Sequence, residues 1–192
     1  MVQVMKKVTL AVILAAAVAL PASAVAQQSQ NPQPPNQMQR QGQQPDKDSQ
    51  KFIKAVIEGN NAEIEVGKLA QQKGQTDAVK QYGAMLVKDH GDANTKALQV
   101  AHQLNVEPPT GTSLGQKATY AKLKVLSGGS FDKSFAKSMV SDHQSDIKEY
   151  QQQAQKSDPA GNFAKETLPT LQKHLDQAQK LEQQVNQKES SR

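Results

Sequence analysis

The sequence of 192 residues contains no cysteine and no tryptophan, and aromatic residues make up only 4% of it. Without cysteine the chain cannot form a disulfide framework, a thiolate metal site or a cysteine nucleophile. The shortage of aromatic residues and of β-branched runs argues against an all-β sandwich and against a module that stacks on nucleic-acid bases. The length suits one domain with short appendages, and that domain must be stabilised by packing alone.

Long hydrophobic runs are also scarce, and the clearest one covers residues 8–20 directly after two lysines. This run is too short to cross a bilayer as a helix, which takes about 20 residues. Small residues follow it and fit signal-peptidase cleavage after Ala24 or Ala26. We therefore expect residues 1–26 to be a cleaved signal peptide, with an uncleaved membrane anchor as the alternative.

Without the expected signal peptide, the chain has only a small net charge. Loss of the two leader lysines leaves 21 Lys and Arg against 18 Asp and Glu, a net charge of +3. So small and dispersed a charge argues against a nucleic-acid partner. The leader predicts a periplasmic or secreted protein without a transmembrane span in the mature chain, either a monomer or a homodimer, and an envelope partner of unknown identity remains open.

A spacer rich in glutamine and proline follows the leader. Residues 27–45 include nine Gln and four Pro, and such a composition cannot bury enough apolar surface to offset the entropy of ordering. We expect a disordered linker over residues 27–47.

Helical periodicity dominates the rest of the chain. Apolar residues recur at spacings of three and four over residues 51–73, 77–105, 131–156 and 160–188, and a shorter helical segment covers 113–126. The candidate N-caps are Asp48 or Ser49, Thr76, Ser113, Ser130 and Asp158. These patterns predict an all-α, antiparallel four-helix bundle over residues 48–188, with an extra short helix between the second and third long helices and a disordered tail at 189–192.

Three of the four histidines lie on the inward stripes of three different helices. These are His90, His143 and His174, whereas His102 is rotated by about 120° from the stripe of its helix. Glu63 lies among small residues on the inward stripe of the first helix. Three imidazoles and one carboxylate suit a divalent first-row transition metal ion, whose identity the pattern does not specify.

Two aspartates directly precede two of these histidines. Because neighbouring residues on a helix diverge by about 100°, Asp89 and Asp142 are better placed to support or bridge a metal site than to share one ion with the adjacent histidine. The alternative is a buried Asp–His hydrogen-bond network without metal, in a non-catalytic stress-response or partner-binding module of the envelope. The sequence contains neither Gly-x-Ser-x-Gly nor His-Glu-x-x-His, so no catalytic residue and no organic cofactor is predicted.

Four segments give the chain a family resemblance. They read AEIEVGKLA at 62–70, MLVKDH at 85–90, MVSDH at 139–143 and LPTLQKH at 168–174. In this order they resemble the bacterial domain-of-unknown-function family 4142, and the likeness covers about residues 48–185.

The resemblance implies an exported, ferritin-like four-helix bundle of the bacterial envelope, often described as a membrane or outer-membrane protein, with no settled activity. The family's motif positions fall on Glu63, Asp89, His90, Asp142, His143 and His174. The chain contains no Glu-x-x-His, the motif with which ferritin-like proteins hold iron. This departure argues against iron oxidation and storage.

Overall fold

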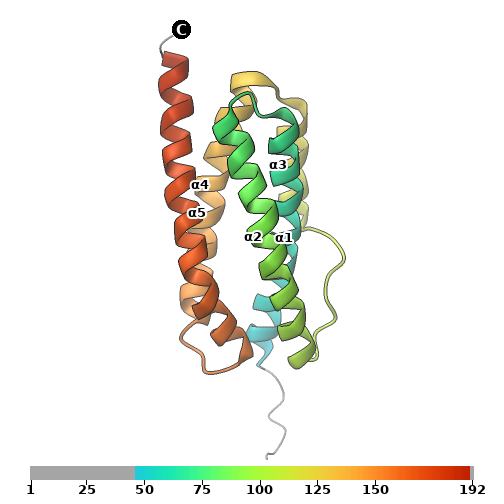
Figure 1. The fold of residues 1–192 in the computed structure, drawn as a ribbon. Coiled ribbons are helices and arrows are strands. Elements are labelled where there is room, and N and C mark those ends of the chain that lie inside the picture. The colour runs from blue at the N-terminus through green and yellow to red at the C-terminus, as the bar shows by residue number, and fades with distance from the viewer. Residues whose placement is uncertain (1–45, 191–192) are drawn as a thin grey trace, which may run out of the picture. The chain divides into compact units, whose positions relative to one another are not determined.

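The computed structural model describes residues 46–190, and the expected signal peptide and almost all of the expected linker lie outside this range. Helices account for nearly all of the described chain, and no strand occurs in it (Figure 1). The helices are α1 (Lys47–Lys73), α2 (Asp77–Gln103), α3 (Leu114–Val125), α4 (Gly128–Gln153) and α5 (Pro159–Ser190). Among the described residues, no helix is both long enough and apolar enough to cross a membrane.

Most helices begin where the sequence predicts. The Thr76 hydroxyl caps α2, Ser113 and Gln116 form a reciprocal capping box on α3, and Asp158 Oδ1 accepts a bond of 2.7 Å from the amide of Gly161 in the first turn of α5.

Two predicted caps are wrong. Asp46, rather than Asp48 or Ser49, caps α1, because the Ser49 hydroxyl is buried and donates instead to Asp158 at 2.5 Å. Helix α4 begins at Gly128 rather than after Ser130, and Gly128 has a φ of 57°, a left-handed conformation that glycine adopts without a steric penalty.

The long helices bury two separate apolar clusters. The first contains the N-terminal half of α1 and α5 and the C-terminal half of α2 and α4, and the second contains the opposite halves. Helices α1 and α5 therefore run in one direction and α2 and α4 in the other. The connection through α3 returns the chain to the end at which α2 began, as Figure 1 shows. The structure thus confirms an all-α bundle with a short helix between the second and third long helices, and its single crossover is the ferritin-like connection.

A polar layer separates the two clusters. Near the boundary between the two clusters each long helix carries a buried polar residue: Glu63 on α1, with Asn60 about one turn before it, His90 on α2, His143 on α4 and His174 on α5. None of these residues is more than 6% exposed. Because each helix crosses the middle of the bundle once, the four residues meet at one level.

Candidate metal centre

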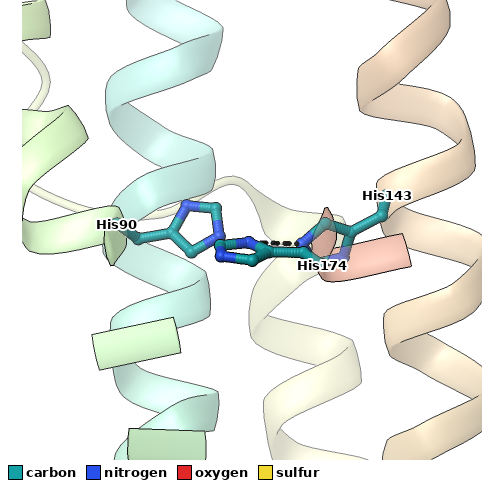
Figure 2. A group of neighbouring side chains, drawn as sticks. All are labelled: His90, His143 and His174. Carbon is teal, nitrogen blue, oxygen red and sulfur yellow. Dashed lines mark hydrogen bonds between the residues drawn. The ribbon is translucent and has the colours of Figure 1, made fainter. Parts of the chain in front are cut away.

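The three histidines converge from α2, α4 and α5 in the centre of the bundle (Figure 2). One ring nitrogen of each lies within 4.8 Å of the corresponding nitrogens of the other two. The ring centroids are 5.8 Å apart for His90 and His143, 5.1 Å for His90 and His174, and 5.2 Å for His143 and His174. The sequence prediction that these three residues meet is confirmed.

His143 is fixed by the backbone of its own helix. Its Nδ1 lies 2.9 Å from the carbonyl oxygen of Met139. Since a carbonyl only accepts hydrogen bonds, Nδ1 carries the proton of the neutral ring, and Nε2 presents a lone pair to the centre of the cluster.

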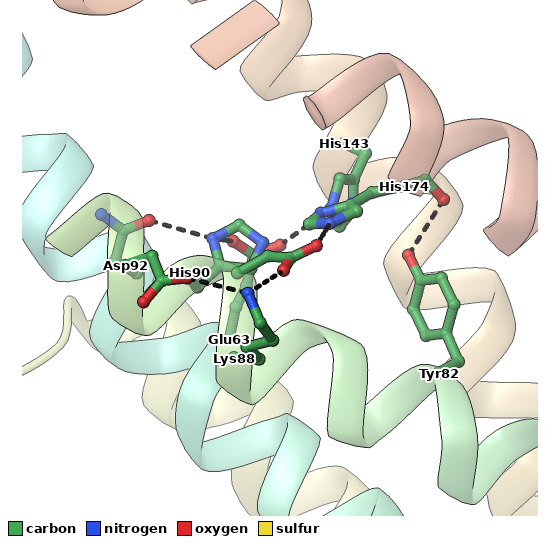
Figure 3. Close-up of polar contacts among 9 residues, drawn as sticks. Glu63, Tyr82, Lys88, His90, Asp92, His143 and His174 are labelled. Atoms are coloured by element: carbon green, nitrogen blue, oxygen red, sulfur yellow. Dashed lines mark hydrogen bonds and ion pairs between the residues drawn. The ribbon is translucent and has the colours of Figure 1, made fainter. Parts of the chain in front are cut away.

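His174 is fixed by a carboxylate of another helix. Its Nε2 lies 3.0 Å from Asp89 Oδ2. Figure 3 shows His174 with its neighbours His143 and Tyr82. Although partial burial opposes ionisation of Asp89, its bonds to His174 and Lys88 hold the pKa of this carboxyl below its ordinary value. The ionised carboxylate accepts from Nε2–H, so His174 Nδ1 presents the lone pair. The Tyr82 hydroxyl also donates to the His174 carbonyl at 3.1 Å, which holds α2 against α5 at this level.

His90 is fixed from α1. Its Nδ1 lies 2.9 Å from Asn60 Oδ1 and 3.0 Å from Glu63 Oε2. Both oxygens accept from Nδ1–H, and the buried Nε2 has no hydrogen-bond partner. All three rings thus have one nitrogen bonded to an oxygen and the other free to act as a ligand, which is the arrangement typical of metal-binding histidines.

The spacing of the free donors matches a small metal ion. His143 Nε2 lies 3.2 Å from His174 Nδ1 and 3.5 Å from Glu63 Oε1. Two nitrogens bound to one tetrahedral zinc ion at about 2.0–2.1 Å are about 3.3 Å apart. In the neutral tautomers the two imidazole lone pairs face each other, and this contact is favourable only with a cation between them.

Burial disfavours a proton as that cation. Desolvation lowers the pKa of His143 to about 4, and it also lowers the pKa values of His90 and His174. For His90, repulsion from the charged forms of the other two rings adds to the effect. The rings are therefore neutral near pH 7, the state in which imidazole binds metals.

Glu63 supplies an oxygen at the edge of the cluster. Its Oε1 is buried and has no hydrogen-bond partner. Burial, followed by repulsion from Asp146 and Asp142, raises the pKa of this carboxyl well above its ordinary value. A metal ion beside Oε1 would favour the ionised form and remove the penalty of the unpaired atom.

The structure brings five of the six predicted residues together: Glu63, Asp89, His90, His143 and His174. Asp142 instead lines a neighbouring pocket with Asp146. It directly precedes His143 on α4, and neighbouring side chains of a helix point about 100° apart. Which of the six bind an ion stays a prediction. His102 is exposed and takes no part in the cluster.

Sequence reasoning missed Asn60 and Asp146. Asn60 lies three residues before Glu63 on the same helical stripe, and Asp146 lies three residues after His143. Spacing of three was thus an available signal for both.

The fold and this layer define an all-α bundle with a buried three-histidine cluster as a candidate metal centre. The model of the family described as "Domain of unknown function (DUF4142)" matches residues 33–181. The chain belongs to this family, which confirms the resemblance, and the family's description assigns no activity. No curated protein matches the chain.

One solved structure similar to this fold is titled "Crystal structure of DUF305 fragment from Deinococcus radiodurans". The TM-score is 0.64 at 10% sequence identity, with 74% of this chain and 98% of that chain covered. At this identity the likeness concerns the fold alone.

Proposed function

We propose that this protein is an exported helical bundle that binds one divalent first-row transition metal ion through His90, His143 and His174, with Glu63 as an oxygen ligand. The observation that carries the proposal is the orientation of the rings. Each histidine has one nitrogen bonded to an oxygen of Met139, Asp89 or the Asn60–Glu63 pair, and the other nitrogen faces the cluster.

The donor set narrows the class of ion. Three imidazole nitrogens and one carboxylate oxygen suit Zn²⁺, Cu²⁺, Ni²⁺ or Co²⁺ better than Mg²⁺ or Ca²⁺, which prefer oxygen ligands. The chain supplies two features such a site needs: neutral rings, and a position between two apolar clusters.

Elemental analysis of the full chain, purified without a polyhistidine tag, tests the proposal. We expect close to one metal ion per chain in the parent and none in the His90→Ala, His143→Ala, His174→Ala variant. His102→Ala is the matched control, because it removes an exposed histidine of α2. Added metal should also raise the melting temperature of the parent by mass action.

Two outcomes contradict the proposal. One is the absence of metal from the parent after loading with each of the four ions. The other is metal content that His102→Ala lowers as much as the triple variant does. Single His→Gln variants that remain helical keep the test valid if the triple variant does not fold.

Export is the second part of the proposal, and it is supported by the sequence of residues 1–26. Mass spectrometry of the protein from a cell fractionation should find a mature chain that begins at Val25 or Gln27, in the periplasm, the medium or the outer-membrane fraction. An intact N-terminus in the cytoplasm contradicts it.

A further inference from the structure

A narrow cavity of about 30 Å³ lies between α1 and α4 and reaches the level of the histidine cluster. Its lining includes exposed residues, Ala55 and Glu149, and residues that are only 3% exposed, Asn60 and His90. The cavity is therefore a passage from the surface to the buried polar layer. A cavity needs about 10–15 Å³ to hold a water molecule, so this one has room for a water or for a ligand of similar size.

The side-chain amide of Asn60 provides an observation that is independent of the histidine ligands. Its Oδ1 accepts a hydrogen bond from His90 Nδ1 at 2.9 Å, whereas its Nδ2 is buried and has no hydrogen-bond partner. A buried donor without an acceptor costs free energy unless a water or a bound ligand satisfies it. Because Asn60 lines the cavity, this donor points to an acceptor of about the size of water inside it.

His90 places the same cavity beside the candidate metal centre. It lines the cavity together with Glu63, and its free Nε2 is one of the nitrogens that face the cluster. Structural zinc sites are closed by their protein ligands, whereas catalytic sites keep one position for water or substrate. A passage that ends at a metal-binding histidine is typical of the second kind of site.

We propose that the ion of the histidine site keeps one coordination position open toward this cavity, and that a water molecule binds there and accepts a hydrogen bond from Asn60 Nδ2. The inference rests on the proposed function and deepens it, because it makes the centre one that binds an exchangeable ligand. Asp146 and Glu149 line the cavity and no Lys or Arg does, so a neutral ligand is favoured over an anion. The volume of the cavity restricts the ligands that can replace this water to molecules of a few atoms.

Cu²⁺ is the probe, because pulsed electron paramagnetic resonance detects the deuterons of a water bound to this ion after transfer to D₂O. The full chain and a Gly59→Leu variant are loaded with Cu²⁺. Gly59 lines the cavity, and the nearest atom of another helix to a Cβ added there would be Gln116 Nε2 at 3.8 Å. A leucine side chain therefore has space at this position and would fill the passage.

We expect the deuterium signal of a directly bound water in the parent and its loss, per bound ion, in Gly59→Leu. The matched control is Gly91→Leu, which makes the same change on α2 at a position that does not line the cavity and has no atom within 4 Å of an added Cβ. This control should keep the signal. Ala55→Leu, at the exposed end of the passage, is the second blocking variant and should lose the signal as well.

The inference is wrong if the copper-loaded parent has no directly bound water, or if both blocking variants keep the water signal of the parent. Copper content, measured on the same samples, separates this result from the proposed function. A parent that binds copper through the three histidines but without a bound water confirms the metal site and contradicts the open position alone. A parent that takes up no copper, zinc, nickel or cobalt contradicts both.

Discussion

At the scale of the residue, the three histidines are held by oxygens of three different kinds: a backbone carbonyl, a carboxylate, and a side-chain amide shared with a carboxylate. Only the partner of His174 is ionised and partly exposed. Each anchor fixes which nitrogen of its ring is free. The anchors can therefore be tested separately from the ligands.

Asp89→Ala should weaken zinc binding by about 10–100-fold, because His174 loses the acceptor that fixes its tautomer and orientation. Asp92→Ala is the control, since Asp92 also pairs with Lys88 but contacts none of the histidines. Competition with a chromophoric chelator measures both affinities. Equal zinc affinities in the two variants would contradict the proposal that Asp89 anchors His174.

Asp146 gives a pH dependence with a definite sign. Burial, with repulsion from Asp142 and Glu149, raises its pKa from 3.8 to about 7. The folded chain thus holds a proton that the unfolded chain releases, and this residue makes stability fall as the pH rises from about 4 to about 7. Asp146→Asn removes the effect.

Urea unfolding at pH 4.5 and pH 8 checks this expectation. Because Asp146 is only half-buried, we expect Asp146→Asn to gain about 1–2 kcal/mol relative to the parent at pH 8 and much less at pH 4.5. The exposed Glu166→Gln serves as the control. A gain in the free energy of unfolding that is the same at both pH values would contradict the assignment of this pH dependence to Asp146.

At the scale of the element, α1 and α2 approach each other through glycines. A Cβ atom at Gly83 would lie 2.6 Å from the carbonyl oxygen of Gly67, and one at Gly67 would lie 2.7 Å from that of Gly83. Backbone atoms cannot move aside as a flexible side chain can. This close approach brings Glu63 on α1 and His90 on α2 within contact distance.

Gly83→Ala should therefore destabilise the bundle by about 2–4 kcal/mol through overpacking. Gly91→Ala on the same helix has no atom within 4 Å of the added Cβ, and it should stabilise the chain by up to about 1 kcal/mol through helix propensity. Urea unfolding of the two variants measures the contrast. Similar effects in both would show that helix propensity, not the helix contact, determines the role of Gly83.

The sequence predicts the elements well where the signals are local. Thr76, Ser113 and Asp158 cap the helices as expected, because each bonds to an amide three residues later in its own first turn. The start of α1 could not be assigned in this way. Ser49 is a good capping residue by type, but it is used by Asp158, 109 positions further along the chain.

In the candidate site, too, the sequence predicts what local patterns determine and misses what depends on contacts between helices. The helical stripes suffice to bring His90, His143 and His174 to one level. They do not reveal that Asn60 orients His90, or that Asp142 turns toward a pocket, because both depend on how neighbouring helices rotate against each other. Distances of an ångström decide such contacts, and periodicity does not resolve them.

At the scale of the whole molecule, the polar layer interrupts what would otherwise be one continuous apolar core. Buried Asn60, Glu63 and His90 each contribute one atom without a hydrogen-bond partner. Such a layer lowers the stability of the metal-free bundle, as expected where a sequence retains polar groups for a functional site.

Replacing the layer with apolar residues should stabilise the chain by about 1–4 kcal/mol when a chelator is present. The combined change is Asn60→Ala, Glu63→Met, His90→Leu, His143→Leu and His174→Leu. Adding zinc should then raise the stability of the parent but not of the variant, which urea unfolding with and without the ion detects. Loss of cooperative unfolding in the variant would instead assign the layer a structural role.

The placement of the layer has a mechanical consequence. Glu63 and His90 belong to the α1–α2 hairpin, and His143 and His174 belong to the α4–α5 hairpin, while the chain between the hairpins runs through the long connection and α3. An ion held by all four residues would fasten the two hairpins together across the middle of the bundle. It would close a long loop in the chain, and would thereby act as a reversible crosslink in a protein that has no cysteine to form a permanent one.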